Sequence, residues 1–489
     1  MTYSKQRLKE VTALKRAAVR RIQNDICEID ASTSRKYILE FNREFQTFQS
    51  VCETKEVLEQ AQQVNLIWIG DYHALVQSQI YATEFLRGLA ASKNNLAVAV
   101  EPVFGRNQEI LDRWMAGKIS EQEFLDRVHY HEEWGCEWEG YRAIFAAARE
   151  LHIPIYGVDC HPRNDMRSIS RRDLGVARRI ARLMEKNPQR TLVVIFGESH
   201  LASNHLPRRV RAILDRKGIE AKELLIVQNI DALYWKLQEA GFGEARAARL
   251  RDGCYCVFNA TPIEKYESFR QYLHKCIEED SSGDWTLLAQ TLMEIMMDFL
   301  AMKKNQSVAS LMSSPEFDSP CASQFQLGNA AEEFARSIHQ ACRGELDKPV
   351  ERAAHDQFFV EVIEHGLGYF CSKLLDSSRD GIESLAGRVL SQIGQNEQQL
   401  TRAIELLIDP GKRPGAQHFA ALRAAIDAKA GKQKTTRMLA QLLGYALGRR
   451  LYIAYMQSRI SRKEIHALFH DPLNTPLRPL ECYRELHFL

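Results

Sequence analysis

The feature that most constrains this chain is a series of short apolar segments between Leu66 and Asn259. Each is rich in β-branched or aliphatic residues and almost free of polar ones: LIWIG, LAVAVE, IPIYGVD, TLVVIFG, ELLIVQN and YCVFN. Between them lie segments such as ALVQSQIYATEFLRGLA and RRDLGVARRIARLMEK, whose apolar residues recur at helical spacing. Strands of this kind are buried on both faces. The pattern therefore predicts an α/β fold with a mostly parallel sheet sandwiched by helices.

After Pro262 the strand-like segments stop while helical spacing continues. We expect helices near residues 262–303, 328–345, 349–376, 380–408, 415–428 and 433–460, with a Ser/Pro-rich loop at about 305–328. Four glycines inside these patterns predict close helix contacts: Gly366, Gly368, Gly444 and Gly448. Residues 5–60 indicate one or two amphipathic helices. We predict an α/β domain over residues 1–262, including this helical extension, and an all-helical domain over residues 263–489.

Composition narrows the class of protein. The chain has 489 residues, 45% hydrophobic and 26% charged, which is typical of a globular protein. Its net charge of +2, from 65 basic and 63 acidic residues, argues against a nucleic-acid-binding protein defined by overall charge. The sequence shows neither a secretory signal nor an 18-residue apolar run, and its eleven cysteines lack the spacing of a disulfide framework. We expect a cytoplasmic protein without a membrane span.

Three of the predicted strands run directly into an acid followed two residues later by a histidine. These motifs are GDYH at 70–73, GVDCH at 157–161 and GESH at 197–200, and a glutamate ends the strand LAVAVE. The carboxyl ends of parallel strands form the crevice in which ligands bind, so we expect these side chains to converge. The predicted cluster comprises Asp71, His73, Glu101, Asp159, His161, Glu198 and His200.

Two kinds of chemistry suit such a cluster. His73, Glu101, Glu198 and His200 are candidate catalytic residues, because acids and imidazoles at a partly desolvated edge can perform general acid–base work. Three of them, His73, Glu101 and His200, are also candidate ligands for a divalent metal with an open position for water. The alternative is structural: Asp71 and Glu198 stand just before predicted helices and could cap them.

These motifs resemble those of the ChaN-like proteins of the haem-binding uptake and Tiki superfamily, which has erythromycin-esterase-like proteins as distant relatives. The resemblance covers about residues 66–260. GDYH is similar to the family's G-E-x-H, with Asp71 in place of the usual glutamate, and GESH is similar to its closing G-x-x-H. VEPVFGRNQEIL resembles the stretch that carries the family's glutamate and glutamine, here Glu101 and Gln108. The resemblance implies either hydrolysis or the binding of haem or iron.

Two further segments contribute candidate ligand-binding residues. HYHEEWGCEWEGY (129–141) is rich in aromatics that we expect to pack on the sheet edge, with Trp138 or Tyr141 as part of a pocket wall. Arg163 and Arg167 follow the third strand at the expected mouth of the crevice. Since arginine binds carboxylates and phosphates in a bidentate manner, they predict an anionic ligand, for which haem propionates would qualify.

Taken together, the sequence favours a hydrolase acting on an anionic small molecule or peptide, with water activated by a metal or by a histidine base. The alternative is a haem- or iron-binding protein without catalytic activity. Neither a P-loop, nor a dinucleotide fingerprint, nor a G-x-S-x-G motif follows a strand, which disfavours those classes of enzyme. For the helical domain we expect contact with a protein partner or formation of a homo-oligomer.

Overall fold

A computed structural model gives the structure of residues 3–29, 36–161, 169–277, 286–302, 327–345, 350–393, 398–428 and 433–489. The chain divides into two compact units. The α/β unit comprises Gln23–Leu237 and Ala245–Asp280, and the helical unit comprises Met1–Ile22, Gln238–Glu244 and Ser281–Leu489. The boundary that we place between residues 262 and 263 stays a prediction. Most of the predicted loop, residues 305–326, lies outside the described residues.

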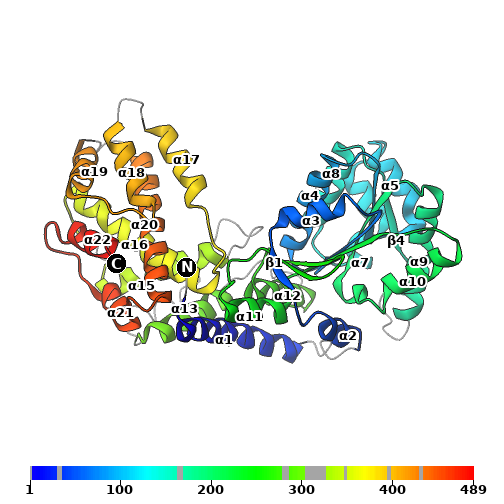
Figure 1. Ribbon diagram of the computed structural model, residues 1–489, viewed down its shortest axis with the longest axis horizontal. Helices are drawn as coiled ribbons and strands as arrows, with labels where there is room; N and C mark the ends of the chain where they lie inside the picture. Colours follow the sequence, from blue (N-terminus) through cyan, green and yellow to red (C-terminus); the bar gives the residue numbers. More distant parts are fainter. Residues whose placement is uncertain are drawn as a thin grey trace. The chain divides into compact units, whose positions relative to one another are not determined.

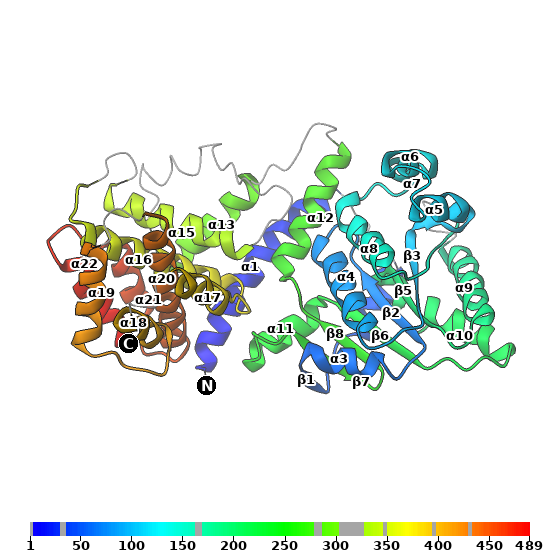
Figure 2. The same ribbon diagram turned by 90° about the horizontal axis from the view of Figure 1, so that it is seen from above.

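The α/β unit is built on one sheet of eight strands in the order β1-β7-β8-β6-β2-β5-β3-β4 (Figure 2). The strands are β1 (Ser50–Cys52), β2 (Leu66–Asp71), β3 (Leu96–Phe104), β4 (Ile155–Asp159), β5 (Thr191–Gly197), β6 (Glu223–Gln228), β7 (Ala247–Arg251) and β8 (Cys254–Val257). All pairs from β8 to β4 are parallel, and only the pairs made by β7 are antiparallel. The predicted α/β fold with a mostly parallel sheet is confirmed.

Helices cover both faces of this sheet (Figure 1). One face packs on α3 (Thr54–Ala61), α4 (Val76–Ala90), α5 (Gln108–Met115), α6 (Glu121–Val128) and α8 (Trp138–Glu150). The other face packs on α2 (Lys36–Glu44), α9 (Ile169–Lys186), α10 (Leu206–Arg216) and α11 (Asp231–Ala240). Successive side chains of a strand point to opposite faces, so Ile67 and Ile69 enter the first core while Leu66 and Trp68 enter the second.

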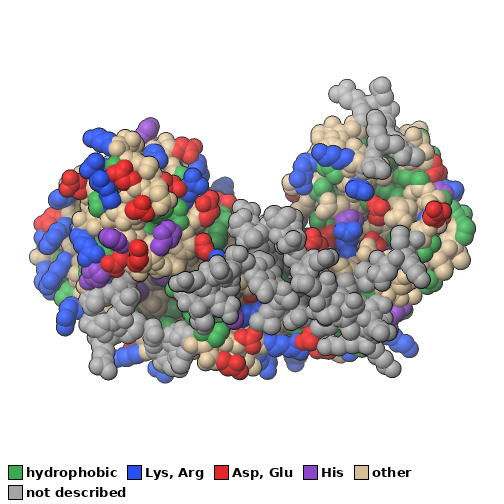
Figure 3. Space-filling view, turned by 180° about the vertical axis from the view of Figure 1, so that it is seen from behind, with side chains coloured by type: hydrophobic (Ala, Val, Ile, Leu, Met, Phe, Trp, Pro, Cys, Tyr) green, Lys and Arg blue, Asp and Glu red, His purple; other side chains and the backbone are tan. Residues whose placement is uncertain are grey.

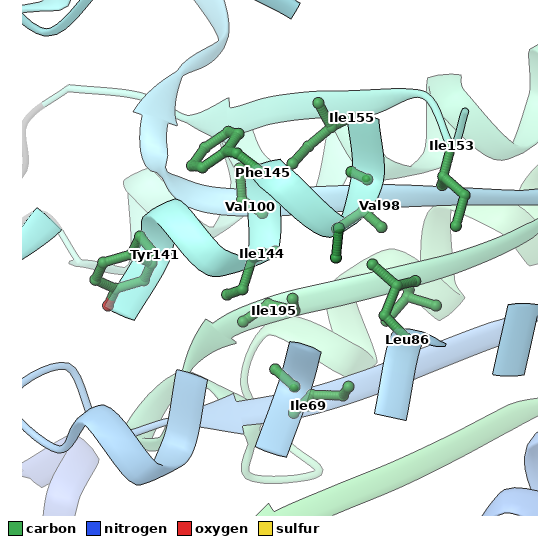
Figure 4. Packing of buried hydrophobic residues seen from close by; sticks show 14 of the residues in the cluster. Ile69, Leu86, Val98, Val100, Tyr141, Ile144, Phe145, Ile153, Ile155 and Ile195 are labelled. Atoms are coloured by element: carbon green, nitrogen blue, oxygen red, sulfur yellow. The ribbon is translucent and has the colours of Figure 1, made fainter. Parts of the chain in front are cut away.

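Figure 4 shows how the first core is filled. Ile69, Val98 and Ile195, from three neighbouring strands, pack with Leu86 of α4 and Ile144 of α8, and all five are at most 1% exposed. Burying an aliphatic side chain of this size contributes roughly 1.5–3 kcal/mol relative to leaving it exposed. The strands that carry the predicted site residues are therefore held in a well-packed sheet.

Two strands were not predicted, β1 and β7. β1 lies in the segment predicted as helical and has only three residues, while Arg249 and Arg251 interrupt the apolar pattern of β7. Both lie at or next to the edge of the sheet, where one side of a strand is solvated and the continuous apolar signal of a central strand is missing.

The C-terminal region is helical, as predicted. Its helices are α12 (Pro262–Ile277), which belongs to the α/β unit, and α13 (Thr286–Leu300), α15 (Leu327–Arg343), α16 (Ala354–Leu375), α17 (Ile382–Gln392), α18 (Gln398–Ile408), α19 (Ala416–Ala428), α20 (Gln433–Met456), α21 (Arg462–His470) and α22 (Arg478–His487). The predicted segments 262–303 and 380–408 each contain two helices. Within the described residues, no helix is long and apolar enough to cross a membrane. The N-terminal segment forms α1 (Lys5–Ile29).

Glycines allow α16 and α20 to approach each other closely. A Cβ atom at Gly444 would lie 2.3 Å from the Cβ of His365, and one at Gly448 would lie 2.4 Å from the carbonyl oxygen of Gly366. Such distances are far inside van der Waals contact, so any larger residue would force the helices apart. The prediction that these glycines mark close helix contacts is confirmed.

Candidate functional site

Parallel pairing brings the ends of four strands to one edge of the sheet. β5 lies between β2 and β3, and β3 lies next to β4. Asp71 is paired with Gly197 in the β2–β5 register, and the backbone N–H of Gly197 donates a 2.5 Å hydrogen bond to Oε2 of Glu101. Asp159 ends β4. Four of the predicted positions are thus brought together by the register of the sheet alone: Asp71, Glu101, Asp159 and Glu198, which directly follows β5.

Asp71 orients His73. Its carboxylate is buried and accepts hydrogen bonds from the side chains of Gln79 and Tyr141. The same carboxylate lies 2.8 Å from Nδ1 of His73, which fixes the direction of the imidazole. Gly140 permits this arrangement, because a Cβ there would lie 2.8 Å from the amide oxygen of Gln79. Asp71 does not cap α4, whose N-cap residue is Leu75.

His73 is the accessible member of the cluster. Its side chain is 32% exposed, and its Nε2 lies 3.6 Å from Oε2 of Glu101. The rings of His73 and Trp134 pack edge to face, with their centroids 4.5 Å apart. Burial acts to lower the pKa of His73, but the neighbouring carboxylates of Glu101 and Asp71 outweigh it and raise the pKa above its usual 6.5. His73 therefore has an increased affinity for a proton.

A buried arginine joins two of the acids. Nε and Nη2 of Arg172, on α9, donate to the two carboxylate oxygens of Asp159 at 2.7 and 2.9 Å, and Nη2 also donates to Glu101. Burial acts to lower the pKa of Arg172, but the two carboxylates raise it overall. All three side chains are less than a tenth exposed. This ion-pair network holds Glu101 in place beside His73.

Arg172 was not among the residues predicted for the site. The position of Arg172 in the helical repeat of apolar residues could have revealed that it is buried. Arg172 stands four residues before Val176 and eight before Ile180, on the apolar stripe of α9, and all three residues are buried. A charge on an apolar stripe indicates a buried partner of opposite charge.

His200 lies beside Arg172. Its Nδ1 is 2.6 Å from Asp173, whose other oxygen accepts a 2.9 Å hydrogen bond from Tyr37, and its Nε2 is 3.5 Å from Nη1 of Arg172. The side chain of His200 is 7% exposed. Asp173 and Tyr37 were not predicted; Asp173 adjoins Arg172 in the sequence and shares its buried position on α9.

The predicted divalent-metal site at His73, Glu101 and His200 is not supported. A guanidinium stands against both Glu101 and His200, so positive charge is already supplied where the metal was expected. In the part of the chain that the structure describes, no group of three or more His, Cys, Asp or Glu side chains is arranged to hold a metal ion.

Glu198 forms a separate ion pair. Its Oε1 accepts from Nζ of Lys265, on α12, at 3.1 Å. That ammonium group also donates to the backbone carbonyl of Asn229 and lies over the ring of Tyr72. Burial raises the pKa of Glu198, and Lys265 opposes the shift. The ion pair between Glu198 and Lys265 thus links α12 to the end of β5. The sequence motifs did not reveal Lys265 as a partner of Glu198.

The other predicted site residues lie in different surroundings. Tyr141 belongs to the cluster through Asp71, whereas Trp138 is buried among Trp114, Phe124, Tyr130 and Phe145 in the core. Gln108 bonds the backbone of β4 at Ile155 and Gly157, so its contacts are structural. His161 is exposed, with its ring against Phe104 and its Nε2 3.5 Å from Glu133. Arg163 and Arg167 lie outside the described residues.

Comparison with known proteins finds a family match within the α/β unit. Residues 57–176 match the family model described as "Haem-binding uptake, Tiki superfamily, ChaN". No curated protein matches the chain. The solved structure "Cofacial heme binding to ChaN of Campylobacter jejuni" is similar at 14% sequence identity over 37% of this chain and 87% of that chain, with a TM-score of 0.28. The predicted resemblance is confirmed by the family match: residues 57–176, which include β2, β3 and β4, match the ChaN family of the haem-binding uptake, Tiki superfamily.

Proposed function

We propose that this site is the catalytic centre of a hydrolase that acts on an anionic small molecule or peptide, with His73 as the general base. One observation carries the proposal. Asp71 binds Nδ1 of His73, while Nε2 is directed toward the buried carboxylate of Glu101 from a ring that is one-third exposed. A base held by a second group, next to a place that a substrate can reach, is the arrangement that nucleophile activation requires.

The reaction follows from these contacts. With the Nδ1–H donated to Asp71, the lone pair on Nε2 takes a proton from a water molecule. The water oxygen then attacks the carbonyl carbon of the substrate, and the imidazolium returns its proton to the leaving group as the bond to that group breaks. Asp71 and Glu101 stabilise the charged imidazolium, which is the physical reason for the raised pKa of His73. Glu101 accepts a hydrogen bond from the attacking water, while Arg172 and the N–H of Gly197 hold its own oxygens.

The test is hydrolysis of a panel of carboxylated and phosphorylated esters and peptides by the purified protein. His73→Ala is expected to lower kcat/KM by roughly 10²–10⁴, the range for loss of a general acid–base residue. His161→Ala is the matched control, because His161 also follows a strand end but lies outside the cluster. The control is expected to keep activity within about twofold. Equal activity of His73→Ala and the wild type, or a wild type inactive on the whole panel, contradicts the proposal.

The position of Arg172 makes the proposed reaction metal-independent. Dialysis against EDTA is therefore expected to leave kcat/KM unchanged, because the positive charge beside Glu101 belongs to the Arg172 side chain and not to a bound metal ion. Elemental analysis of the purified protein provides the second readout. Stoichiometric zinc or manganese, together with loss of activity in EDTA, contradicts this form of the mechanism.

Haem binding is a second candidate, favoured by the description of the matching family and by the ring of Trp134 beside the exposed imidazole of His73. In this function His73 would hold the haem iron through Nε2, and Trp134 would contact the porphyrin. Titration with haem is then expected to give a Soret band that His73→Ala shifts and His161→Ala does not. The absence of a shift with His73→Ala contradicts this candidate and leaves the hydrolase proposal unaffected.

A further inference from the structure

A basic groove lies between α9 and α10, and none of the residues of the Arg172 network lines it. Its volume is about 490 Å³, and it is lined by Arg178, Arg182, Glu185, Lys186, Ile213 and Lys217. Four of the six lining side chains are cationic and one is acidic. Figure 3 shows lysine and arginine side chains gathered along the left edge of the α/β unit in that view.

The cations are arranged in a row. Arg178, Arg182 and Lys186 are spaced by four residues on α9, so their Cα atoms rise about 6 Å apart along one face of the helix. All three are exposed, and none of them forms an ion pair with another residue that the structure describes. Lys217, just after α10, is paired with Glu185 at 2.7 and 2.8 Å. Three cations therefore face the groove without a neutralising acid of their own.

The lining narrows the class of ligand. Ile213 is the one apolar side chain that reaches the groove, and no aromatic side chain lines it, so the stacking platform on which single-stranded nucleic acids bind is missing. The apolar residues of both helices face the core instead: Val176, Ile180, Met184, Val210 and Leu214 are each at most 2% exposed. Neither helix thus presents an apolar face that could enter a membrane.

We propose that this groove binds a compact polyphosphorylated group, either from a soluble molecule or from a lipid headgroup. Guanidinium groups bind phosphate oxygens in a bidentate manner, and ammonium groups add point charges. The volume lies within the range of roughly 300–1,000 Å³ found for small-molecule sites. Several phosphates on one small group match a row of cations at about 6 Å spacing better than a single phosphate does. The groove is separate from the site of His73.

Calorimetric titration of the full-length protein with tripolyphosphate tests the proposal, at an ionic strength of about 0.15 M so that long-range attraction is screened. The variant Arg178→Gln/Arg182→Gln is expected to bind at least about tenfold more weakly than the wild type. Arg113→Gln/Lys118→Gln is the matched control, because it removes two exposed cations from another part of the same unit. The control is expected to bind within about twofold of the wild type. Unchanged thermal unfolding shows that both variants are folded.

Two further arms identify the source of the phosphates. If vesicles containing phosphatidylinositol bisphosphate bind, phosphatidylserine vesicles do not, and the double variant abolishes the binding, the group is a lipid headgroup. Tripolyphosphate binding without vesicle binding identifies a soluble ligand. Affinity for tripolyphosphate no greater than for inorganic phosphate, or no loss in the double variant, overturns the proposal. Tighter binding of a 20-nucleotide oligomer than of tripolyphosphate, lost in the same variant, also overturns it in favour of a nucleic-acid surface.

Discussion

Two histidine–aspartate pairs lie at the same edge of the sheet, and their surroundings differ. His73, bonded to Asp71, keeps 32% of its side chain exposed and faces the carboxylate of Glu101. His200, bonded to Asp173, keeps 7% exposed and faces the guanidinium of Arg172. The same two residue types therefore form one pair that a ligand can reach and one pair that is enclosed.

The comparison shows what Arg172 does for the site. Its guanidinium contacts Glu101 on one side and His200 on the other, so it separates the open pair from the enclosed pair. A buried ion is costly unless it is paired and hydrogen-bonded, and here each member of the network satisfies another. We infer that the enclosed pair positions Arg172, and that Arg172 in turn positions Glu101 beside His73.

The largest expected effect comes from removing Arg172. Arg172→Gln leaves the carboxylates of Asp159 and Glu101 buried without their cation, which is expected to lower the free energy of unfolding by about 3–5 kcal/mol. Urea denaturation measures this loss. Arg113→Gln, an exposed arginine of the same unit, is the control and is expected to change stability by less than about 0.5 kcal/mol.

A double variant tests whether buried charge is the cause. Adding Asp159→Asn to Arg172→Gln removes one of the two unpaired carboxylates and is expected to recover part of the lost stability. If the double variant is as unstable as the sum of the two single variants, the two side chains are not coupled and the network does not work as described.

Substitution of His200 is expected to affect mainly stability, and substitution of His73 mainly activity. His200→Asn removes one of the two partners of buried Asp173, which keeps its hydrogen bond from Tyr37, and is expected to cost about 1.5–3 kcal/mol in the free energy of unfolding. His73→Asn affects a partly exposed side chain, so its cost is expected to stay below about 1 kcal/mol, although it abolishes the proposed base. Denaturation curves and kcat/KM, measured together, check this division. Equal losses of stability in the two variants would remove the distinction between an open and an enclosed pair.

Much of the fold could be predicted because central parallel strands, buried on both faces, consist of continuous runs of apolar residues. The convergence of Asp71, Glu101 and Asp159 then follows from the parallel pairing of their strands. The strands β1 and β7, at and next to one edge of the sheet, lack this continuous apolar pattern. Motifs also fail to give the direction of a side chain. Trp138 enters the core while Trp134, four residues earlier, meets His73, and charge alone does not distinguish buried Arg172 from its solvated neighbours on α9.

A smaller effect is expected from Tyr141→Phe. The change removes one hydrogen bond to Asp71, whose carboxylate keeps its bonds to Gln79 and His73, so about 1 kcal/mol of stability is expected to be lost. Because Tyr141 helps to fix Asp71, kcat/KM is also expected to fall by a few-fold. The matched control is Tyr156→Phe, which removes a tyrosine hydroxyl that bonds Arg190 away from the site. A loss of activity as large as that of His73→Asn would show that Tyr141 acts directly in the reaction.

The smallest expected effect is a pH dependence of stability that comes from His73. The pKa of His73 is raised in the folded protein, so protonation of this group stabilises the fold. That contribution is complete below the unfolded value of 6.5 and is lost as the pH rises through the folded pKa. The stability difference between the wild type and His73→Asn is therefore expected to be greater at about pH 5.5 than at about pH 9, whereas kcat/KM of the wild type rises over the same interval as His73 becomes an available base. Urea denaturation at several pH values, with His161→Asn as control, measures the first trend. A stability difference that grows with pH would mean that the carboxylates of Glu101 and Asp71 do not dominate the surroundings of His73.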